Sequence, residues 1–391
     1  MKIKVTKDRR GHASVWTQPI RAMFLGLCLF VGLGSGVGEA FGKTPVIFDE
    51  DIDNLIGGNA DPLTMLLHAE NIQILGVTTL SGDGWVRQGT EYALKLLELQ
   101  GRSSIPVYRG AEFPLVQSPA EFVRDTRIYG GVRTDPWLGA YAAHSPAAST
   151  VIAPQGGFAK VREQAVPAAQ FIVDAVRAHP HQIVIYCGGP LTNLALAINL
   201  APDIVPLIKE VVFMGTSPEL QPRTVNVLLD PEAAARVLHA AWPRLTIFTV
   251  DLAEKVRRDI ELARAVSAGG NEPIAKLYKK SVVDPYDRGE TIKWFRMPDE
   301  LMAAYLVDPS IITSSRQYFV DVDLSLGLER GASVYWDVTP KGYGGAPWPR
   351  GHEGPGMQMA VPAADAQIAD VPTDFDVQRF RRLFLALMTR S

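Results

Sequence analysis

The sequence has little cysteine and little excess of charge of either sign. Two cysteines among 391 residues are too few for a disulfide-stapled scaffold or a cysteine-rich zinc module. A net charge of −3 gives no sign of a nucleic-acid-binding surface, so we expect no nucleic-acid partner. With 47% hydrophobic and 21% charged residues, the composition excludes a disordered chain, a collagen-like fibre and a coiled coil.

The first forty residues have a composition of their own. Six lysine and arginine residues precede an uncharged stretch over 22–38, and small residues then lead to Ala40. This pattern is typical of a secretory signal peptide, so we expect residues 1–40 to be one and the protein to be periplasmic or secreted. The apolar run is shorter than the roughly 20 residues of a membrane span, so no stable span is expected after cleavage. An uncleaved N-terminal anchor is the alternative.

Short apolar runs rich in β-branched residues alternate with helical patterns along the rest of the chain. Strands are predicted at 45–48, 72–78, 105–108, 183–186, 211–214 and 245–250. Helices are predicted at 60–69, 86–99, 165–178, 191–200, 231–241 and 376–390. Because the strands are almost continuously apolar, this alternation predicts an α/β fold: a mostly parallel, Rossmann-type open sheet with helices on both faces.

The chain beyond the signal is expected to form one domain, 41–391, because no linker separates two cores. The stretch 114–167 is rich in Pro, Gly, Ala and Ser and should be a long loop region with helical pieces, and the Gly- and Pro-rich stretch 342–355 should be irregular. Asp230 and Pro231 suit the cap and first turn of the helix that follows. Cys187 lies in the apolar run QIVIYCGG, where a buried side chain is expected rather than a nucleophile.

Acidic side chains gather directly after the first predicted strand, in the sequence VIFDEDIDN. In open α/β sheets, ligands bind outside the carboxyl ends of the strands. Carboxylates this close repel one another unless a cation compensates, and oxygen ligands without nearby His or Cys favour Ca²⁺ or Mg²⁺ over zinc. A solvated acidic turn is the alternative. The residues concerned are Asp49, Glu50, Asp51 and Asp53.

Two known acidic motifs agree only partly with this stretch. An EF-hand loop counted from Asp49 would need Gly at its sixth position and Glu at its twelfth, where Asn54 and Ala60 stand. VIFDED also resembles the DxD motif of haloacid-dehalogenase-like Mg²⁺ phosphatases. Asp53 stands where that family has Thr or Val, and no late acidic Mg²⁺ motif is seen.

An ordered series of motifs resembles the nucleoside hydrolase family of the inosine-uridine preferring type. It runs from residue 45 to about 313 and comprises VIFDED, ADPLTMLLHA, ILGVTTLSGDG, IPVYRGAEFPL, YCGGPLTNLALAINLAPDIVPLIKEVVFMG, TVNVLLDPEAAARVL, FTVDLAEKV and MPDELMAAYLVDPSIIT. The resemblance implies that family's α/β fold and a Ca²⁺-dependent hydrolase that cleaves the N-glycosidic bond of a ribonucleoside or related N-riboside. Ribose and a free base would be the products, and a homo-oligomer is implied as a possibility.

The resemblance also implies roles for individual residues. Asp51 would be the general base, acting on a water bound to the metal. The metal ligands would be Asp51, Asp61, Asp299 and the main-chain oxygen of Thr192. The residues that bind or support the substrate would be Asp49, Asp83 and Asn226.

Several positions depart from the family pattern. Nine residues, 52–60, separate Asp51 from Asp61, and Ala60 replaces the first aspartate of the family's Asp-Asp pair. Thr224 stands where a sugar-binding Glu is common, and Pro298 where some members have His. A degenerate member that binds Ca²⁺ and sugar without efficient turnover is therefore an alternative, a DxD phosphatase is a lesser one, and the base and sugar stay open.

Overall fold

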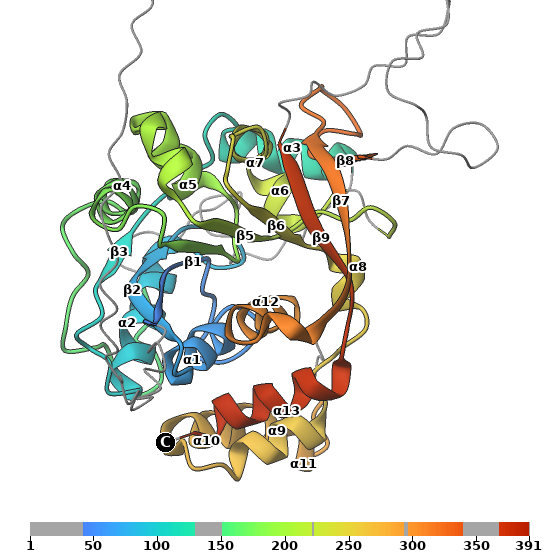
Figure 1. Cartoon of the computed structure of the whole chain (residues 1–391). Coiled ribbons are helices and arrows are strands. Elements are labelled where there is room, and N and C mark those ends of the chain that lie inside the picture. Colours follow the sequence, from blue (N-terminus) through green and yellow to red (C-terminus); the bar gives the residue numbers. More distant parts are fainter. Residues whose placement is uncertain (1–41, 130–150, 221–222, 293–295, 339–366, 391) are drawn as a thin grey trace, which may run out of the picture. The chain divides into compact units, whose positions relative to one another are not determined.

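The first strand of the computed structural model, β1 (Thr44–Glu50), lies inside a nine-stranded sheet (Figure 1). The structure describes residues 42–129, 151–220, 223–292, 296–338 and 367–390. Over these residues the strand order is β3-β2-β1-β4-β5-β6-β9-β7-β8. The remaining strands are β2 (Ile72–Thr79), β3 (Val107–Arg109), β4 (Val184–Cys187), β5 (Glu210–Met214), β6 (Leu245–Phe248), β7 (Ile312–Val322), β8 (Ser333–Asp337) and β9 (Ile368–Phe375).

Strand direction and order together mark one place in the sheet. The strands from β3 to β9 are paired in parallel, and only β7 runs antiparallel to its neighbours β9 and β8. From β1 the chain proceeds to β2 and β3 on one side, whereas β4, β5 and β6 follow on the other. The order therefore reverses between β1 and β4, and a crevice opens at the carboxyl ends of strands at such a point.

Helices cover both faces of the sheet (Figure 1). Val46 and Phe48 of β1 pack into one apolar core with α1, α2, α12 and α13, and Ile47 between them packs into a second core with α4, α5 and α7. The helices are α1 (Asp61–His68), α2 (Val86–Leu99), α3 (Pro119–Tyr129), α4 (Ala168–Ala178), α5 (Thr192–Leu200), α6 (Val225–Leu229), α7 (Pro231–Leu238), α8 (Val250–Ala253), α9 (Ile260–Ser267), α10 (Glu272–Tyr278), α11 (Asp284–Asp287), α12 (Pro298–Val307) and α13 (Val377–Met388). The predicted α/β fold is confirmed.

Local details of the prediction are also confirmed. Helix α2 has the predicted bounds, and Asp230 caps α7 by accepting a hydrogen bond of 3.1 Å from the Ala233 amide. Cys187 is fully buried. Residues from Gly42 onward form one compact unit, and the single domain 41–391 stays a prediction. The predicted signal peptide and the stretch 342–355 lie outside the described residues, so these predictions stay as they are.

Strands β7, β8 and β9 were missing from the prediction. Most of β7 is exposed or half-buried, so the sequence there has no run of apolar residues to indicate a buried strand. Its pairing partner β9 begins some fifty residues later. A strand that is held in place by pairing with a distant segment, rather than by burial, leaves only a weak pattern in its own sequence.

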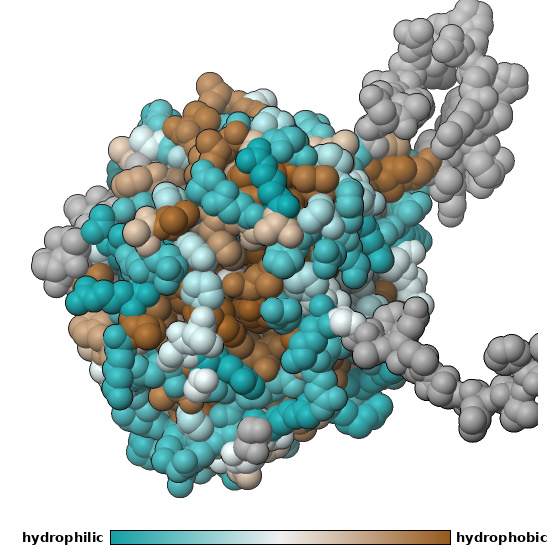
Figure 2. Space-filling model, turned by 60° about the vertical axis from the view of Figure 1, so that its left-hand side comes forward, coloured by the Kyte–Doolittle hydropathy of each residue, from teal (hydrophilic) through white to brown (hydrophobic). Residues whose placement is uncertain are grey.

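The surface carries apolar side chains as well as charged ones. Figure 2 shows one face with hydrophilic residues around apolar residues gathered near its centre. The connection between β7 and β8 also exposes Leu326, of which 91% is accessible. In the described part of the chain, no helix has the length and apolarity needed to cross a membrane. Homo-oligomer formation stays a prediction.

Candidate active site

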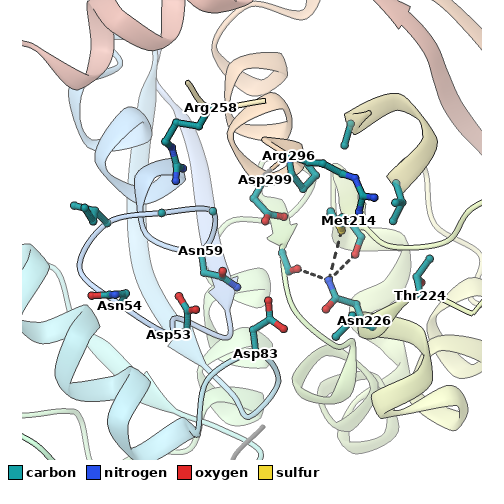
Figure 3. A pocket seen from close by; sticks show the side chains of 18 of the residues that line it. Asp53, Asn54, Asn59, Asp83, Met214, Thr224, Asn226, Arg258, Arg296 and Asp299 are labelled. Atoms are coloured by element: carbon teal, nitrogen blue, oxygen red, sulfur yellow. Dashed lines mark hydrogen bonds between the residues drawn. The ribbon is translucent and has the colours of Figure 1, made fainter. Parts of the chain in front are cut away.

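A cavity of about 480 Å³ opens where the strand order reverses. Its wall combines residues from the loop after β1, the loop after β2, the end of β4, and the start of α12. Figure 3 shows acidic and amide side chains facing this space from several elements. The polar and charged residues of the wall are Asp53, Asn54, Asn59, Asp83, Thr224, Asn226, Arg258, Ser281, Thr291, Arg296 and Asp299.

Asp51 does not line the cavity, but it is hydrogen-bonded to Asn59 and Asp83, which do. Its Oδ1 accepts a bond of 2.6 Å from Asn59 Nδ2, and its Oδ2 accepts one of 2.6 Å from the Asp83 amide. A Cβ at Gly82 would lie 1.9 Å from Asp51 Oδ2, so only glycine fits there without displacing the carboxylate. Burial, together with repulsion from Asp83, raises the pKa of Asp51 to about 6.

Asp299 faces the cavity from the first turn of α12. Its carboxylate is nearly buried, and Oδ1 accepts no hydrogen bond. Tyr186 of β4 donates a 3.0 Å bond to the Asp299 carbonyl and stacks on Phe48 of β1, so the sheet fixes this end of the helix. Burial, with repulsion from Glu300, Asp51 and other carboxylates, raises the pKa of Asp299 well above its usual value.

The donor chemistry of this wall fits a hard cation. Its polar side chains are carboxylates, amides and hydroxyls apart from two arginines, and Asp299 Oδ1 is a buried acceptor that lacks a donor. Repulsion among buried carboxylates is what a bound divalent cation relieves. No three Asp, Glu, His or Cys side chains of the described residues are assembled around a single point. A cation would therefore have to draw its ligands together.

Asp61, a predicted metal ligand, is held by protein groups on both oxygens. Its Oδ2 accepts a bond of 2.9 Å from Arg258 Nη2 and a second from the Tyr278 hydroxyl, and its Oδ1 accepts a bond of 3.1 Å from the Gly57 amide. Arg258 Nη2 also donates a 2.5 Å bond to Glu300 Oε1. The carboxylate thus faces a guanidinium in this structure, and its role as a metal ligand stays a prediction.

The other predicted residues lie around the same strand ends. Asn226 lines the cavity and donates to the carbonyls of Gly188 (2.5 Å) and Met214 (2.9 Å), as Figure 3 shows. Asp83 lines it as well. Thr192 begins α5 and donates a 2.7 Å bond through its hydroxyl to Asp230.

Asp49 is buried behind the cavity. Its Oδ1 accepts bonds from the Thr78 hydroxyl (2.5 Å) and from Asn193 Nδ2 (2.7 Å). Burial raises the pKa of Asp49 to about 7, although both donors oppose the rise. Asp49 does not line the cavity, and its predicted role in binding or supporting the substrate stays a prediction.

No role was predicted for Asn193, Arg258 or Glu300, although Asn193 bonds to Asp49, Arg258 bonds to Asp61 and Glu300 bonds to Arg258. Asn193 is part of the GPLTN motif and Glu300 follows Asp299, so their neighbours could have drawn attention to them. Arg258 gave no signal, because an arginine just before a helix is ordinarily solvated. Only the tertiary contacts show that it is buried.

The raised pKa values predict how stability depends on pH in metal-free protein. Buried Asp49, Asp51 and Asp230 have pKa values of about 7, 6 and 6, against 3.8 for an ordinary aspartate. The folded chain therefore binds more protons than the unfolded chain between about pH 4 and pH 7. We expect the free energy of unfolding in EDTA to fall by a few kcal/mol, roughly, as the pH rises through this window.

Urea unfolding at a series of pH values between 4.5 and 7.5 measures this slope. The matched control is Asp230→Asn, which keeps the shape of the side chain and removes its share of the slope. Stability that stays level or rises over this window would contradict the prediction.

The comparison with known families decides the assignment. The model of the family described as inosine-uridine preferring nucleoside hydrolase matches residues 46–382. This chain belongs to the nucleoside hydrolase family. The resemblance that the motifs indicated is confirmed, and the chain is a hydrolase of the class that acts on N-ribosyl bonds. The match includes VIFDED and argues against the phosphatase alternative.

Relatives agree with this assignment over most of their length. An inosine-uridine preferring nucleoside hydrolase of Crithidia fasciculata is 28% identical over 288 residues, which is 71% of this chain and 84% of the relative. A non-specific ribonucleoside hydrolase of Escherichia coli is 25% identical, covering 77% and 96%. Among solved structures, a plant nucleoside hydrolase has the same fold, with a TM-score of 0.66 at 18% identity and coverage of 89% and 99%.

Proposed function

We propose that this nucleoside hydrolase cleaves the N-glycosidic bond of a ribonucleoside or related N-riboside in a Ca²⁺-dependent reaction, releasing ribose and free base. The observation that carries the proposal is the convergence of buried and half-buried carboxylates on one cavity at the β1–β4 reversal. Asp51 lies behind the wall, and Asp83 and Asp299 lie in it. The named relatives act on nucleosides, which supports the substrate class.

We assign the cation to the carboxylates of Asp51 and Asp299 and the main-chain oxygen of Thr192, with Asp61 as a further ligand. When bound, Ca²⁺ would supply Lewis acidity and a fixed charge for the sugar hydroxyls. Asp83 and Asn226 line the cavity and offer an acceptor and an amide for those hydroxyls. The oxygen-rich wall would stabilise the positive charge that grows on the ribose as the bond to the base breaks.

Asp51 has the properties of the general base. Burial and repulsion from Asp83 raise its pKa to about 6 in the metal-free chain, which makes it a stronger base than an ordinary aspartate. Asn59 and the Asp83 amide hold one of its oxygens each, which fixes its orientation. The names of the relatives point to different bases: one prefers inosine and uridine, one is purine-preferring and one is non-specific. The base released by this protein is therefore to be determined with a substrate panel.

The test is release of ribose from a panel of ribonucleosides, and from the chromogenic O-riboside p-nitrophenyl riboside, by purified protein with and without EDTA. We expect release that EDTA abolishes and added Ca²⁺ restores. Release that EDTA leaves unchanged would contradict the Ca²⁺ requirement. Sugar and Ca²⁺ binding without release from any nucleoside would favour the degenerate, non-hydrolysing alternative.

A further inference from the structure

Arg258 is unusual because it is an arginine that lies almost fully buried in the cavity wall. It follows α8, lines the cavity and is 92% buried, since only 8% of it is accessible. Its guanidinium also lies 6.0 Å from the centre of the Tyr278 ring. A buried guanidinium keeps its charge at all ordinary pH values, so it has to be neutralised by the groups around it.

Two carboxylates neutralise it, and they come from different parts of the fold. Arg258 Nη2 lies 2.9 Å from Asp61 Oδ2 at the start of α1 and 2.5 Å from Glu300 Oε1 on α12. Glu300 directly follows Asp299, the cavity carboxylate with the unpartnered oxygen. The guanidinium therefore joins the two helices that carry the proposed metal ligands Asp61 and Asp299.

The guanidinium and a divalent cation would compete for the same oxygens. Both Asp61 oxygens already accept hydrogen bonds from Arg258, Tyr278 and the Gly57 amide. A cation that binds both oxygens of Asp61 would have to replace the Arg258 bond at Oδ2, and charge-assisted hydrogen bonds are the strong ones. Glu300 gives Arg258 a second partner, so the arginine need not become an unpaired buried charge when it releases Asp61.

We propose that Arg258 is a positioning residue whose guanidinium occupies Asp61 in the metal-free protein, so that Ca²⁺ binds this pocket only by displacing the guanidinium from Asp61. The inference rests on the proposed function, because it concerns the Ca²⁺ site of that reaction. Arg258 weakens Ca²⁺ binding, but it also neutralises the buried carboxylates of Asp61 and Glu300, so the site can fold without metal. Its effect on Ca²⁺ acts through Asp61 alone.

The test is the dissociation constant for Ca²⁺, measured by calorimetry on the metal-free full chain. Arg258→Gln should bind Ca²⁺ about tenfold more tightly, the factor that corresponds to one charge-assisted hydrogen bond. Arg296→Gln is the matched control. Arg296 lines the same cavity and pairs with Glu254 rather than Asp61, so this variant makes the same change of charge and should shift the constant much less.

A double-mutant cycle separates competition at Asp61 from a general electrostatic effect. Asp61→Asn should weaken Ca²⁺ binding, and adding Arg258→Gln to it should give no further tightening. Arg258→Gln/Glu300→Gln removes one charge of each sign and leaves no unpaired Glu300. It should still tighten binding, and it serves if the single variant fails to fold.

The outcomes distinguish the inference from the proposed function. Equal shifts for Arg258→Gln and Arg296→Gln, or tightening that persists with Asp61→Asn, would overturn the role of Arg258 while the Ca²⁺ site stands. Failure of the wild type and of every variant to bind Ca²⁺ would overturn the Ca²⁺ requirement and the inference together.

Discussion

Asp51→Asn should reduce kcat for nucleoside hydrolysis by about a thousandfold or more, because loss of a general base alone costs roughly 10²–10⁴-fold. The change also removes one of the carboxylates proposed to hold the cation. The asparagine keeps the shape of the side chain and one oxygen that can accept from Asn59 or from the Asp83 amide. Steady-state kinetics at saturating Ca²⁺ measure the effect.

Stability should move differently from activity in this variant. Burial and repulsion from Asp83 make the ionised Asp51 costly, since they raise its pKa to about 6. A neutral side chain should therefore leave the urea midpoint in EDTA unchanged or raise it. Asp203→Asn is the control: this exposed aspartate pairs with Arg177 far from the cavity and should alter neither quantity. More than a tenth of wild-type activity in Asp51→Asn would disprove its assignment as the base.

Asn193→Ala should lower the free energy of unfolding by about 3 kcal/mol or more, since it removes two buried hydrogen bonds, one of them to a carboxylate, and a third that is partly buried. The Asn193 amide donates to Asp49 Oδ1 (2.7 Å) and to the Thr79 carbonyl (3.1 Å), and its oxygen accepts from the Ala111 amide (2.8 Å). One side chain thus ties α5 to the ends of β1 and β2 and to the loop after β3.

The same helix provides a matched control. Asn199 is exposed on α5 and bonds only to Arg236, at 2.8 Å, among the contacts described. Asn199→Ala should cost no more than about 0.5 kcal/mol. Urea unfolding in EDTA compares the two variants without any contribution from bound metal. Similar losses for both would mean that Asn193 does not hold the strand ends together.

The amino-acid sequence by itself determined the local elements and the class of fold. Apolar runs of strand length and a helical repeat over 86–99 identify β1 and α2 because each of these patterns is set by neighbours a few residues apart. Asp49 and Asp51 could be placed at a strand end for the same reason. The order of the strands could not be read, because it depends on which apolar edges meet in space, and neither could the antiparallel pairing of β7 with β9.

The tertiary structure alone decided which charges face each other in the site. Asp61 and Arg258 are 197 residues apart, and Asn193 and Asp49 are 144 apart. Along the sequence, Asp61 has the position of a metal ligand and Arg258 that of a solvated arginine before a helix. Only folding removes both from water, and a charge deprived of water must find an opposite charge or a donor wherever the fold supplies one. That requirement acts in space and leaves no periodic pattern in the sequence.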